Sequence, residues 1–335
     1  MRNSEPLILG ISIGDLNGIG GEIILKTFQD ERMLEFCTPI IFASAKTISF
    51  LKNHFGFKLN FHGINDLEKA LPKKINVFNT WKEQPKINFG QEDPKIGQYA
   101  IKSLKAAVSA LKNKTIDALV TAPVNKHTIQ SKEFKFPGHT DFLAQELNGN
   151  SLMLMVNDTL RVGLLTDHLP VKDVPNKIDA KIIRSKIETI HDALVIDFRI
   201  TKPKIAVLGI NPHVGDNGVI GEEDDNVMKP TLKSIREEGT LVFGPYAADS
   251  FFGSNNYKQF DAIIASYHDQ GLIPFKMVHG AKSGVQLSLG LPFLRTSVDH
   301  GTAKDIFGKN KADSGSMENA ITVAIKLLKN KPIVW

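Results

Sequence analysis

The sequence has few of the features that mark secreted and membrane proteins. It contains one cysteine, Cys37, so no intramolecular disulfide can form, which favours a reducing compartment. No apolar run is long enough to cross a bilayer, and the residues before Gly14 show no signal-peptide region. We therefore expect a soluble, cytoplasmic protein with no membrane partner. We interpret Cys37, at the entry to an apolar run, as a small buried hydrophobic residue and not as a nucleophile.

The sequence also lacks a strong charge of either sign. It has 41 Lys and Arg residues against 36 Asp and Glu residues, a formal net charge of +5. The lysines are spread along the chain, with no arginine-rich run and no interleaving of basic and aromatic residues. We therefore expect no nucleic-acid partner. The mild positive charge would help to attract an anionic substrate.

Hydrophobic residues make up 42% of the 335-residue chain, which is ordinary for a globular protein, and this length predicts two domains. Apolar runs typical of buried strands alternate with segments of helical periodicity. Strands are predicted at residues 7–13, 39–43, 75–79, 116–121, 152–156, 160–166, 204–210 and 260–267. Helices are predicted at residues 21–28, 98–112, 181–197, 222–238 and 317–328. This alternation predicts an α/β protein with largely parallel sheets, and a hairpin over 152–166 would make one sheet mixed.

Three histidines follow apolar runs in short polar segments: His168, His213 and His268. Ligands in open α/β sheets bind beyond the carboxyl ends of the strands, so these histidines are placed to share one site. Three neutral imidazoles can hold a divalent metal and leave a position open for substrate. A lone loop histidine is more often structural. Here Asp167 and Asp269 flank two of the histidines and could orient their rings, although either acid could instead satisfy its own turn.

Other polar segments carry weaker signals. The glycine-rich turn Gly14–Glu22 could receive an anion at a helix N-terminus, but it matches neither a Rossmann fingerprint nor a P-loop, and a tight structural turn explains it as well. His139 and Thr140 could donate to a phosphate or carboxylate; the alternative is that Thr140 or Asp141 caps the following helix. Lys276 and Arg295 could each bind an anionic group, and the polar loop 299–305 could wrap a nucleotide.

Taken together, these motifs closely resemble the 4-hydroxythreonine-4-phosphate dehydrogenase family of pyridoxal phosphate biosynthesis. The resemblance covers nearly the whole chain. It rests on seven ordered segments: Gly14–Glu22, Thr121–Lys126, Gly138–Phe142, His168–Pro170, Leu208–Gly215, Tyr267–Gly271 and Gly290–Thr302.

The resemblance implies two three-layer α/β/α domains flanking a cleft, in a fold like those of isocitrate and isopropylmalate dehydrogenases. The first domain would comprise residues 1–125 and 270–335 and carry the dinucleotide loop. The second, residues 126–269, would contribute to the metal site and to a homodimer with active sites at the subunit interface. These boundaries are approximate.

The resemblance also implies the roles of the site residues. His168, His213 and His268 would bind one divalent metal per active site, shared between the subunits of the homodimer. Three histidines favour zinc over magnesium, and cobalt and manganese stay open. Substrate contacts would come from His139, Thr140, Lys276, Gln286 and Arg295, and the cofactor loop would be Asp299, His300, Gly301 and Thr302. The catalytic residues would be Lys276 and Asp249, although Asp249 also fits a polar turn.

The implied reaction is the NAD-dependent or NADP-dependent oxidation of 4-phosphohydroxy-L-threonine. Its product, 2-amino-3-oxo-4-phosphooxybutanoate, would lose carbon dioxide to give 3-amino-2-oxopropyl phosphate. Gln286 departs from the family pattern, because an asparagine usually stands there. That change keeps open a related dehydrogenase acting on threonate or erythronate phosphates. A zinc hydrolase and a non-catalytic module that binds an acidic partner are the alternatives from other classes.

Overall fold

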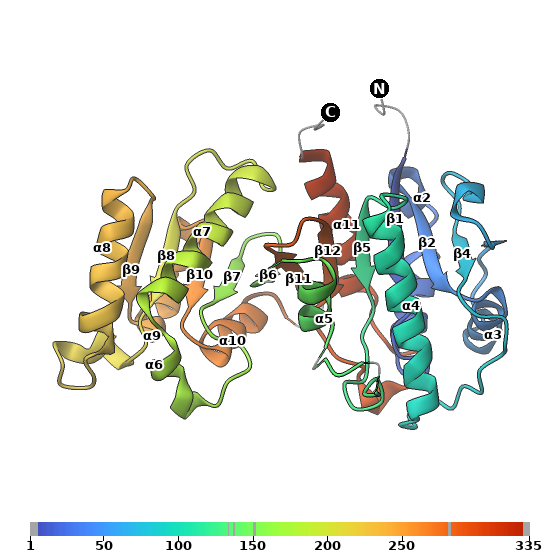
Figure 1. Ribbon diagram of the computed structural model, residues 1–335, viewed down its shortest axis with the longest axis horizontal. Helices are drawn as coiled ribbons and strands as arrows, with labels where there is room; N and C mark the ends of the chain where they lie inside the picture. Colours follow the sequence, from blue (N-terminus) through green and yellow to red (C-terminus); the bar gives the residue numbers. More distant parts are fainter. Residues whose placement is uncertain (1–5, 133, 137, 150–151, 281–282, 331–335) are drawn as a thin grey trace. The chain divides into compact units, whose positions relative to one another are not determined.

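The computed structural model describes residues 6–132, 134–136, 138–149, 152–280 and 283–330 (Figure 1). The chain divides into two compact units, which we describe separately. Unit 1 comprises Met1–Ser151 and Leu291–Lys329, and unit 2 comprises Leu152–Gly290 and Asn330–Trp335. The approximate boundaries placed residues 126–151 in the second domain and residues 270–290 in the first. In the structure, residues 126–151 belong to unit 1 and residues 270–290 belong to unit 2.

Both segments are held where they lie by their own packing. Phe134, Phe142 and Leu147 join the buried core of unit 1, each at most 3% exposed. The strand β11 (Val285–Leu289) pairs along its whole length with β6 (Leu152–Val156) of unit 2. The composition of the sequence does not indicate these tertiary contacts, so it could not give the boundaries of the two units.

Unit 1 is built on a parallel sheet in the order β3–β4–β2–β1–β5–β12. The strands are β1 (Leu7–Ser12), β2 (Cys37–Ala43), β3 (His62–Ile64), β4 (Asn76–Asn79), β5 (Ala118–Thr121) and β12 (Leu294–Val298). The helices are α1 (Gly20–Thr27), α2 (Met33–Phe36), α3 (Ala45–Phe55), α4 (Pro94–Lys112), α5 (His139–Glu146) and α11 (Gly315–Asn330).

Helix α4 shows how the sequence produces this packing. Its predicted apolar face, Ile101, Leu104, Val108 and Leu111, is at most 4% exposed and packs on the central strands. Asp93 caps the N-terminus by accepting from the Lys95 N–H. Cys37 is fully buried in β2, and burial raises the pKa of its thiol to about 12. The interpretation of this cysteine as a buried hydrophobic residue is confirmed.

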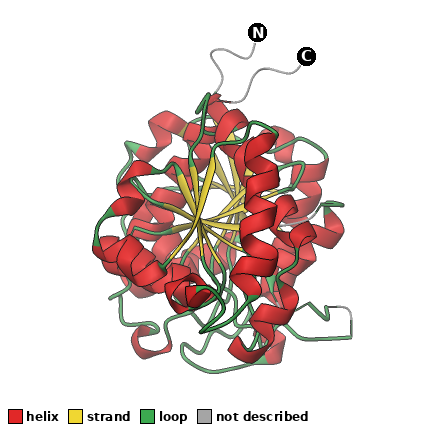
Figure 2. Ribbon diagram, turned by 90° about the vertical axis from the view of Figure 1, so that its left-hand side faces the viewer, coloured by secondary structure: helices red, strands yellow, loops and turns green. Residues whose placement is uncertain are grey.

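Unit 2 contains a mixed sheet in the order β11–β6–β7–β10–β8–β9. The further strands are β7 (Arg161–Leu164), β8 (Ile205–Leu208), β9 (Val242–Tyr246) and β10 (Ala262–Ala265). The predicted hairpin is confirmed, because β6 and β7 pair antiparallel, whereas β7, β10, β8 and β9 are parallel. The helices are α6 (Val174–Lys177), α7 (Ala180–Ile196), α8 (Lys229–Glu237), α9 (Ala248–Gly253) and α10 (His268–His279), and Figure 2 shows helices on both sides of the strands.

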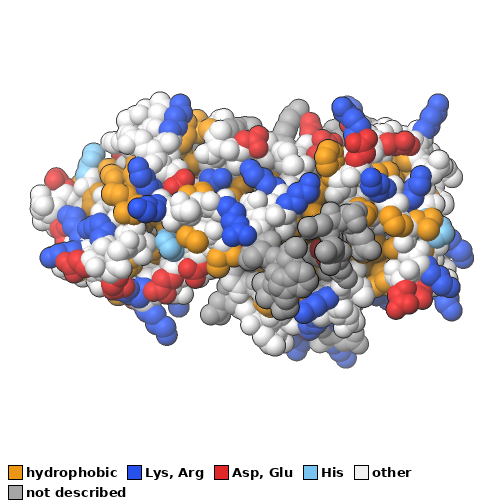
Figure 3. All heavy atoms as spheres, turned by 90° about the horizontal axis from the view of Figure 1, so that it is seen from above, with side chains coloured by type: hydrophobic (Ala, Val, Ile, Leu, Met, Phe, Trp, Pro, Cys, Tyr) orange, Lys and Arg blue, Asp and Glu red, His pale blue; other side chains and the backbone are white. Residues whose placement is uncertain are grey.

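Two local predictions differ from the structure. The helix predicted over 222–238 begins as a π-helical turn, η4 (Asp224–Met228), and becomes α-helical only in α8. His268 does not lie in a loop but is the first residue of α10. The α/β class is confirmed. None of the described helices combines the length and the apolarity that a bilayer span requires. On the face drawn in Figure 3, lysine and arginine side chains are scattered, with no single basic patch.

Candidate active site

In unit 2 the three predicted metal ligands all follow parallel strands. His168 follows β7, His213 follows β8 and His268 follows β10, so all three lie at the same edge of the sheet. The imidazole rings of His168 and His268 lie with their centroids 5.9 Å apart. The structure thus brings two of the three predicted ligands together.

A polar network fixes the ends of these strands. The Thr166 hydroxyl donates to the Ser266 carbonyl at 2.7 Å, and the Ser266 hydroxyl donates to the Leu208 carbonyl at 3.0 Å. The amide of Gln270 accepts from the Ser266 N–H at 2.7 Å and donates to the Gly209 carbonyl at 2.8 Å. Gln270 therefore ties β10 to β8. Gln270 belongs to the motif Tyr267–Gly271, but the sequence alone indicated no role for it.

His213 lies in an unusual stretch of backbone. Residues 213–217 all have positive φ, from 45° at Asp216 to 78° at Gly215, and Val214 has φ 57°. A β-branched residue in the left-handed region is strained, and such strain persists only where surrounding contacts impose it. The left-handed turn ending at Asn217 thus presents His213 in a conformation that the sequence does not prefer by itself.

A buried carboxylate holds the backbone immediately before this turn. Asp224, the first residue of the π-turn η4, is fully buried and accepts the Ile210 N–H at 2.8 Å and the Asn211 N–H at 2.9 Å. The Asn211 side-chain amide donates to the same carboxylate at 3.2 Å. Asp224 therefore holds the chain between the end of β8 and His213. π-helical turns often occur at functional sites. The sequence showed only a helical pattern with acidic residues in its first turn, so it did not indicate that Asp224 holds the chain before His213.

The two acids beside the histidines act differently. Asp269 Oδ1 lies 2.7 Å from His268 Nδ1, which fixes that ring and leaves Nε2 for a ligand, as predicted. Asp167 instead accepts the backbone N–H of His168 at 2.8 Å, and its other oxygen is 4.0 Å from the ring nitrogen. Asp167 is therefore a turn residue in this structure, which is the alternative that the sequence left open.

The donor chemistry of the pair fits a metal. Imidazole nitrogens are ligands that zinc and related divalent metals accept, and the two rings lie close together. Across the described residues, no three His, Cys, Asp or Glu side chains converge closely enough to hold an ion. Within one chain, therefore, only His168 and His268 of the three predicted ligands lie together, and His213 lies at the same edge of the sheet.

Beside His268, a pocket of about 340 Å³ is lined by polar and apolar side chains. Asp249, Tyr267, Asp269 and Gln270 form part of its wall; the apolar lining includes Phe252, Ile273 and Met277. Asp249, in the first turn of α9 beyond β9, thus lies at the same strand edge as the histidines. Lys276 is exposed on α10, and the half-buried Gln286 lies in β11 opposite Met155.

Unit 1 holds the predicted anion-binding residues. Arg295 lies in β12 and is only 1% exposed. Its guanidinium donates to the hydroxyl of Thr121, at the end of β5, from Nε at 3.1 Å and from Nη2 at 2.5 Å. Ser297, two residues further along β12, donates to the Thr121 carbonyl at 3.1 Å. The parallel pairing of β5 and β12 therefore places a fully buried cation at a strand end.

His139 lies close enough to Arg295 for their charges to interact. Burial, followed by the positive charges of Arg295 and Lys126, lowers the pKa of His139 to about 3. The residue as a whole is half-buried, but Nε2 has no solvent exposure and no hydrogen-bond partner in the described structure. Burial also lowers the pKa of Arg295 to about 9. A bound anion would stabilise the desolvated cation of Arg295 and could accept a hydrogen bond from the unpartnered ring nitrogen.

The local structure around His139 differs from the capping alternative. Helix α5 begins at His139 itself, with Gly138 at the N-cap position and no side-chain cap. Neither Thr140 nor Asp141, the capping residues of the alternative interpretation, stands at the N-cap position. Thr140 is half-buried in the first turn.

The predicted cofactor loop is an ordered polar segment of unit 1. Asp299 receives the Ser316 hydroxyl on its carboxylate at 3.3 Å, and His300 Nδ1 lies 3.0 Å from the Gly301 carbonyl. Lys304 donates to Glu92 at 2.6 Å, and this ion pair lowers the pKa of Glu92. Thr302 packs close to Gly18, where an added Cβ would lie 3.4 Å from the threonine Cβ. The loop is therefore held against the glycine-rich turn after β1.

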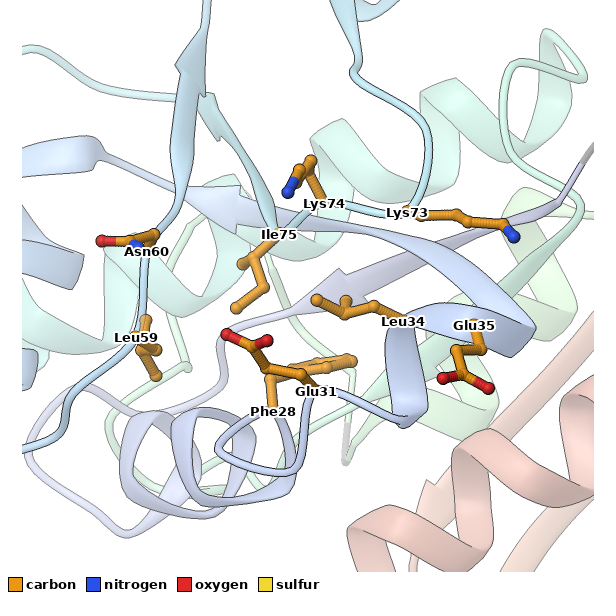
Figure 4. Close-up of a pocket in the computed structure, with 9 residues that line it drawn as sticks. All are labelled: Phe28, Glu31, Leu34, Glu35, Leu59, Asn60, Lys73, Lys74 and Ile75. Atoms are coloured by element: carbon orange, nitrogen blue, oxygen red, sulfur yellow. The ribbon is translucent and has the colours of Figure 1, made fainter.

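A second pocket in unit 1 does not belong to this site (Figure 4). Phe28, Leu59 and Ile75 form its apolar floor, and Glu31, Glu35, Lys73 and Lys74 are among its charged lining residues. None of the predicted site residues lines it.

Buried polar side chains at the ends of parallel strands, in two α/β units, define an α/β enzyme whose sites are built on strand ends. The chain belongs to the family described as Pyridoxal phosphate biosynthetic protein PdxA, whose profile matches residues 35–324. It is 45% identical to the 4-hydroxythreonine-4-phosphate dehydrogenase of Bacteroides thetaiotaomicron, over 96% of this chain and 89% of that protein. It is therefore an oxidoreductase that acts on a CH–OH group.

Two further comparisons bear on fold and substrate. The crystal structure of a 4-hydroxythreonine-4-phosphate dehydrogenase from Burkholderia phymatum superposes with a TM-score of 0.80 at 34% identity, covering 97% of this chain and 99% of that one. The chain is also 35% identical to the D-threonate 4-phosphate dehydrogenase of Cupriavidus necator, over 96% of this chain and 97% of that protein.

Replacing Asp224 by Ala should destabilise the protein. The change leaves the buried N–H of Ile210 and the partly buried N–H of Asn211 without an acceptor. It should lower the free energy of unfolding by about 2–4 kcal/mol, measured by urea denaturation. Asp225→Ala is the matched control on the same turn, because Asp225 makes only a solvent-accessible ion pair with Lys229. Equal effects of the two substitutions would show that Asp224 does not hold the His213 turn.

The stability of the protein should depend on pH through His139. The folded imidazole stays neutral down to a pH of about 3, whereas the unfolded imidazole takes up a proton below about 6.5. The unfolded state therefore binds more protons in that window, and stability falls as the pH drops from about 6.5 toward 3. His139→Asn should flatten this fall by up to about 1.4 kcal/mol per pH unit, measured by urea denaturation at a series of pH values. Parallel wild-type and variant curves would contradict the burial of a neutral His139.

Proposed function

We propose that this protein oxidises 4-phosphohydroxy-L-threonine with NAD or NADP and one divalent metal per active site. The product, 2-amino-3-oxo-4-phosphooxybutanoate, is a β-keto acid and loses carbon dioxide to give 3-amino-2-oxopropyl phosphate. The observation that carries the proposal is the fully buried Arg295, whose charge acts on His139, together with the buried and unpartnered Nε2 of that histidine. The names of the relatives, above all the one from Bacteroides thetaiotaomicron, support the substrate.

The anionic end of the substrate is held by residues of unit 1. Arg295 is rigid, because Thr121 already orients its guanidinium. Burial, and after it the charges of Arg295 and Lys126, keep the pKa of His139 low, so the neutral imidazole donates one N–H to the bound phosphate or carboxylate. Thr140 adds a hydroxyl and a backbone N–H in the first turn of α5, where negative charge is favoured. Lys276 and Gln286 contact the rest of the substrate.

His168, His213 and His268 hold the metal, with Asp269 fixing the His268 ring. When bound there, a divalent ion, zinc before cobalt, manganese or magnesium, would supply Lewis-acid polarisation of the substrate oxygens and so favour loss of the hydroxyl proton. Asp249, at the same strand edge, accepts the hydroxyl proton, and Lys276 stabilises negative charge on the substrate. Asp299, His300, Gly301 and Thr302 would hold the dinucleotide, which would supply the acceptor for the hydride.

The active protein is a homodimer in which the metal ligands come from both subunits. Two features of unit 2 support this. One chain brings only two of the three histidines together. Large apolar side chains stand exposed near the same strand edge: Val219 on the His213 loop is 81% exposed, and Met277 and Ile273 on α10 are 79% and 55% exposed. A second subunit would cover such surface. We place this dimer in the cytoplasm, consistent with its single buried cysteine.

The second candidate substrate is D-threonate 4-phosphate, which lacks the amino group. The similarity to the Cupriavidus necator enzyme favours it, as does Gln286 in place of the usual asparagine. The two substrates share the phosphate and the hydroxyl that is oxidised, so Arg295 and His139 would serve both. Only the contact near the amino group distinguishes them.

The decisive assay follows the absorbance of reduced nicotinamide with each of the two substrates, before and after treatment with a chelator. We expect turnover of 4-phosphohydroxy-L-threonine that the chelator abolishes and zinc or another divalent metal restores. Turnover of D-threonate 4-phosphate alone would replace the first proposal by the second. Turnover that survives complete metal removal would refute the metal site.

Arg295→Met should weaken catalysis through loss of the anion contact. Methionine roughly preserves the side-chain volume, and the loss of charge-assisted hydrogen bonds should reduce kcat/KM by about 10- to 100-fold or more. Arg184→Met, which removes a surface ion pair with Glu238, is the control and should leave kcat/KM unchanged. If a substrate analogue without its phosphate suffered the same loss, Arg295 would not be the phosphate ligand.

A shared metal site predicts complementation between two inactive variants. His213→Ala and His268→Ala should each be inactive as homodimers. After the two are mixed, unfolded and refolded together, a heterodimer whose sites combine His213 of one subunit with His268 of the other has one intact site. Random pairing would then restore about a quarter of the wild-type activity. Zero restoration, with mixed dimers confirmed by mass spectrometry, would mean that both ligands of each site come from one chain.

A further inference from the structure

An ion pair on α1, between Glu22 and Lys26, contacts the backbone at the C-terminal end of the proposed cofactor loop. Glu22 is fully buried, and its Oε1 atom accepts the backbone N–H of Ala312 at 2.7 Å and the ammonium of Lys26 at 3.0 Å. The Lys26 ammonium also donates to the carbonyls of Asn310 at 3.1 Å and Ala312 at 2.8 Å. All three ammonium protons are thus used, two of them on loop backbone.

This pair does more than fill space. Burying a carboxylate is costly, and an apolar pair of similar volume often stabilises a fold as well or better. The other oxygen of Glu22, Oε2, is buried without a hydrogen-bond partner among the described residues. What the pair provides, and an apolar pair could not, is directional contact with the backbone of residues 310–312.

The glycine-rich turn places Glu22 beneath the loop. A Cβ added to Gly20 would lie 2.4 Å from the Ile13 carbonyl oxygen, and one added to Gly21 would lie 2.5 Å from the Leu51 side chain. The two glycines therefore let α1 approach β1 and α3 closely, and the carboxylate one residue later reaches Ala312. This packing explains the glycines of the motif without an anion at the helix N-terminus.

Further contacts fix the same segment from α3. His54 Nε2 lies 3.2 Å from the Gly308 carbonyl oxygen, and the Asn310 amide donates to the Phe55 carbonyl at 3.3 Å. A Cβ on Gly308 would lie 2.7 Å from the Phe89 ring, so loop and ring are in close contact. At the near end, the Asp299 N–H donates to Ser316 at 3.2 Å. The loop 299–312 is thus fastened at both ends. Glu22 and Lys26 make charged contacts with its backbone at the far end, and Glu92 pairs with the Lys304 side chain between the two ends.

We propose that Glu22 and Lys26 are positioning residues for the dinucleotide. They hold the loop 299–312 in its binding conformation before the cofactor arrives, so cofactor affinity depends on them and substrate affinity does not. Ordering an irregular loop on binding costs conformational entropy, and a loop that is already ordered avoids that cost. This inference rests on the proposed cofactor role of Asp299–Thr302.

The test uses Glu22→Gln and Lys26→Met in the full-length protein. Glutamine keeps an acceptor for Ala312 and loses the charge, whereas methionine keeps the stem of Lys26 and loses both loop contacts. The dissociation constant and the KM for NAD should rise by about 10-fold, the scale of one charge-assisted contact. The KM for the phosphorylated substrate should stay within about twofold. Hydrogen–deuterium exchange should increase in residues 299–314 and not in the strands of unit 1.

Lys102→Met is the matched control. Lys102 pairs with Glu83 at 3.1 Å on the surface of the same unit, with both side chains half-exposed, and its loss should change neither constant. A wild-type protein that binds no dinucleotide would overturn the proposed function and this inference together. Wild-type binding with unchanged NAD affinity in both variants would overturn the inference alone. Equal losses in cofactor and substrate affinity, with exchange raised throughout unit 1, would assign the pair to general stability and also overturn it.

Discussion

Parallel pairing of the strands is the constraint from which the site follows. Parallel neighbours need a crossover connection, and all their carboxyl ends come out at one edge of the sheet. In unit 2, β7, β8 and β10 therefore deliver His168, His213 and His268 to a common edge, although long stretches of chain separate them. In unit 1, the pairing of β5 with β12 brings Thr121 to Arg295. No local sequence motif could achieve either arrangement.

Buried charged groups then turn these edges into defined geometries. Asp224 holds the chain before His213, Arg295 lies beneath Thr121, and Glu22 grips the loop that follows β12. Each is at most 1% exposed and bonded to backbone or to a hydroxyl. Such groups add little net stability, because desolvation offsets much of their attraction. Their directional bonds are what a packed apolar core cannot supply, and they occur where the proposed chemistry needs fixed positions.

Some of the proposed site residues would serve the whole family, and others are particular to this chain. The proposed anion contact of Arg295 would suit any phosphorylated hydroxy acid, so it would not choose between the amino substrate and D-threonate 4-phosphate. In our proposal Gln286 is the residue that would bear on that choice, because a glutamine amide reaches one methylene further than an asparagine amide. A hydrolase and a passive binding module no longer compete, since the curated relatives are dehydrogenases.

The sequence by itself determined the α/β class, the periodic face of α4, the buried character of Cys37 and the family. These depend on local periodicity, composition and ordered motifs, which are all read along the chain. It also singled out His268, Asp269 and Arg295. The tertiary structure alone decided that Asp269 orients a ring while Asp167 closes a turn. It also decided that Asp224 accepts the backbone N–H groups of Ile210 and Asn211, and that Glu22 reaches Ala312. The physical reason is that these roles arise from hydrogen bonds and burial between distant segments, and a local pattern does not record which distant backbone group will stand opposite a given side chain.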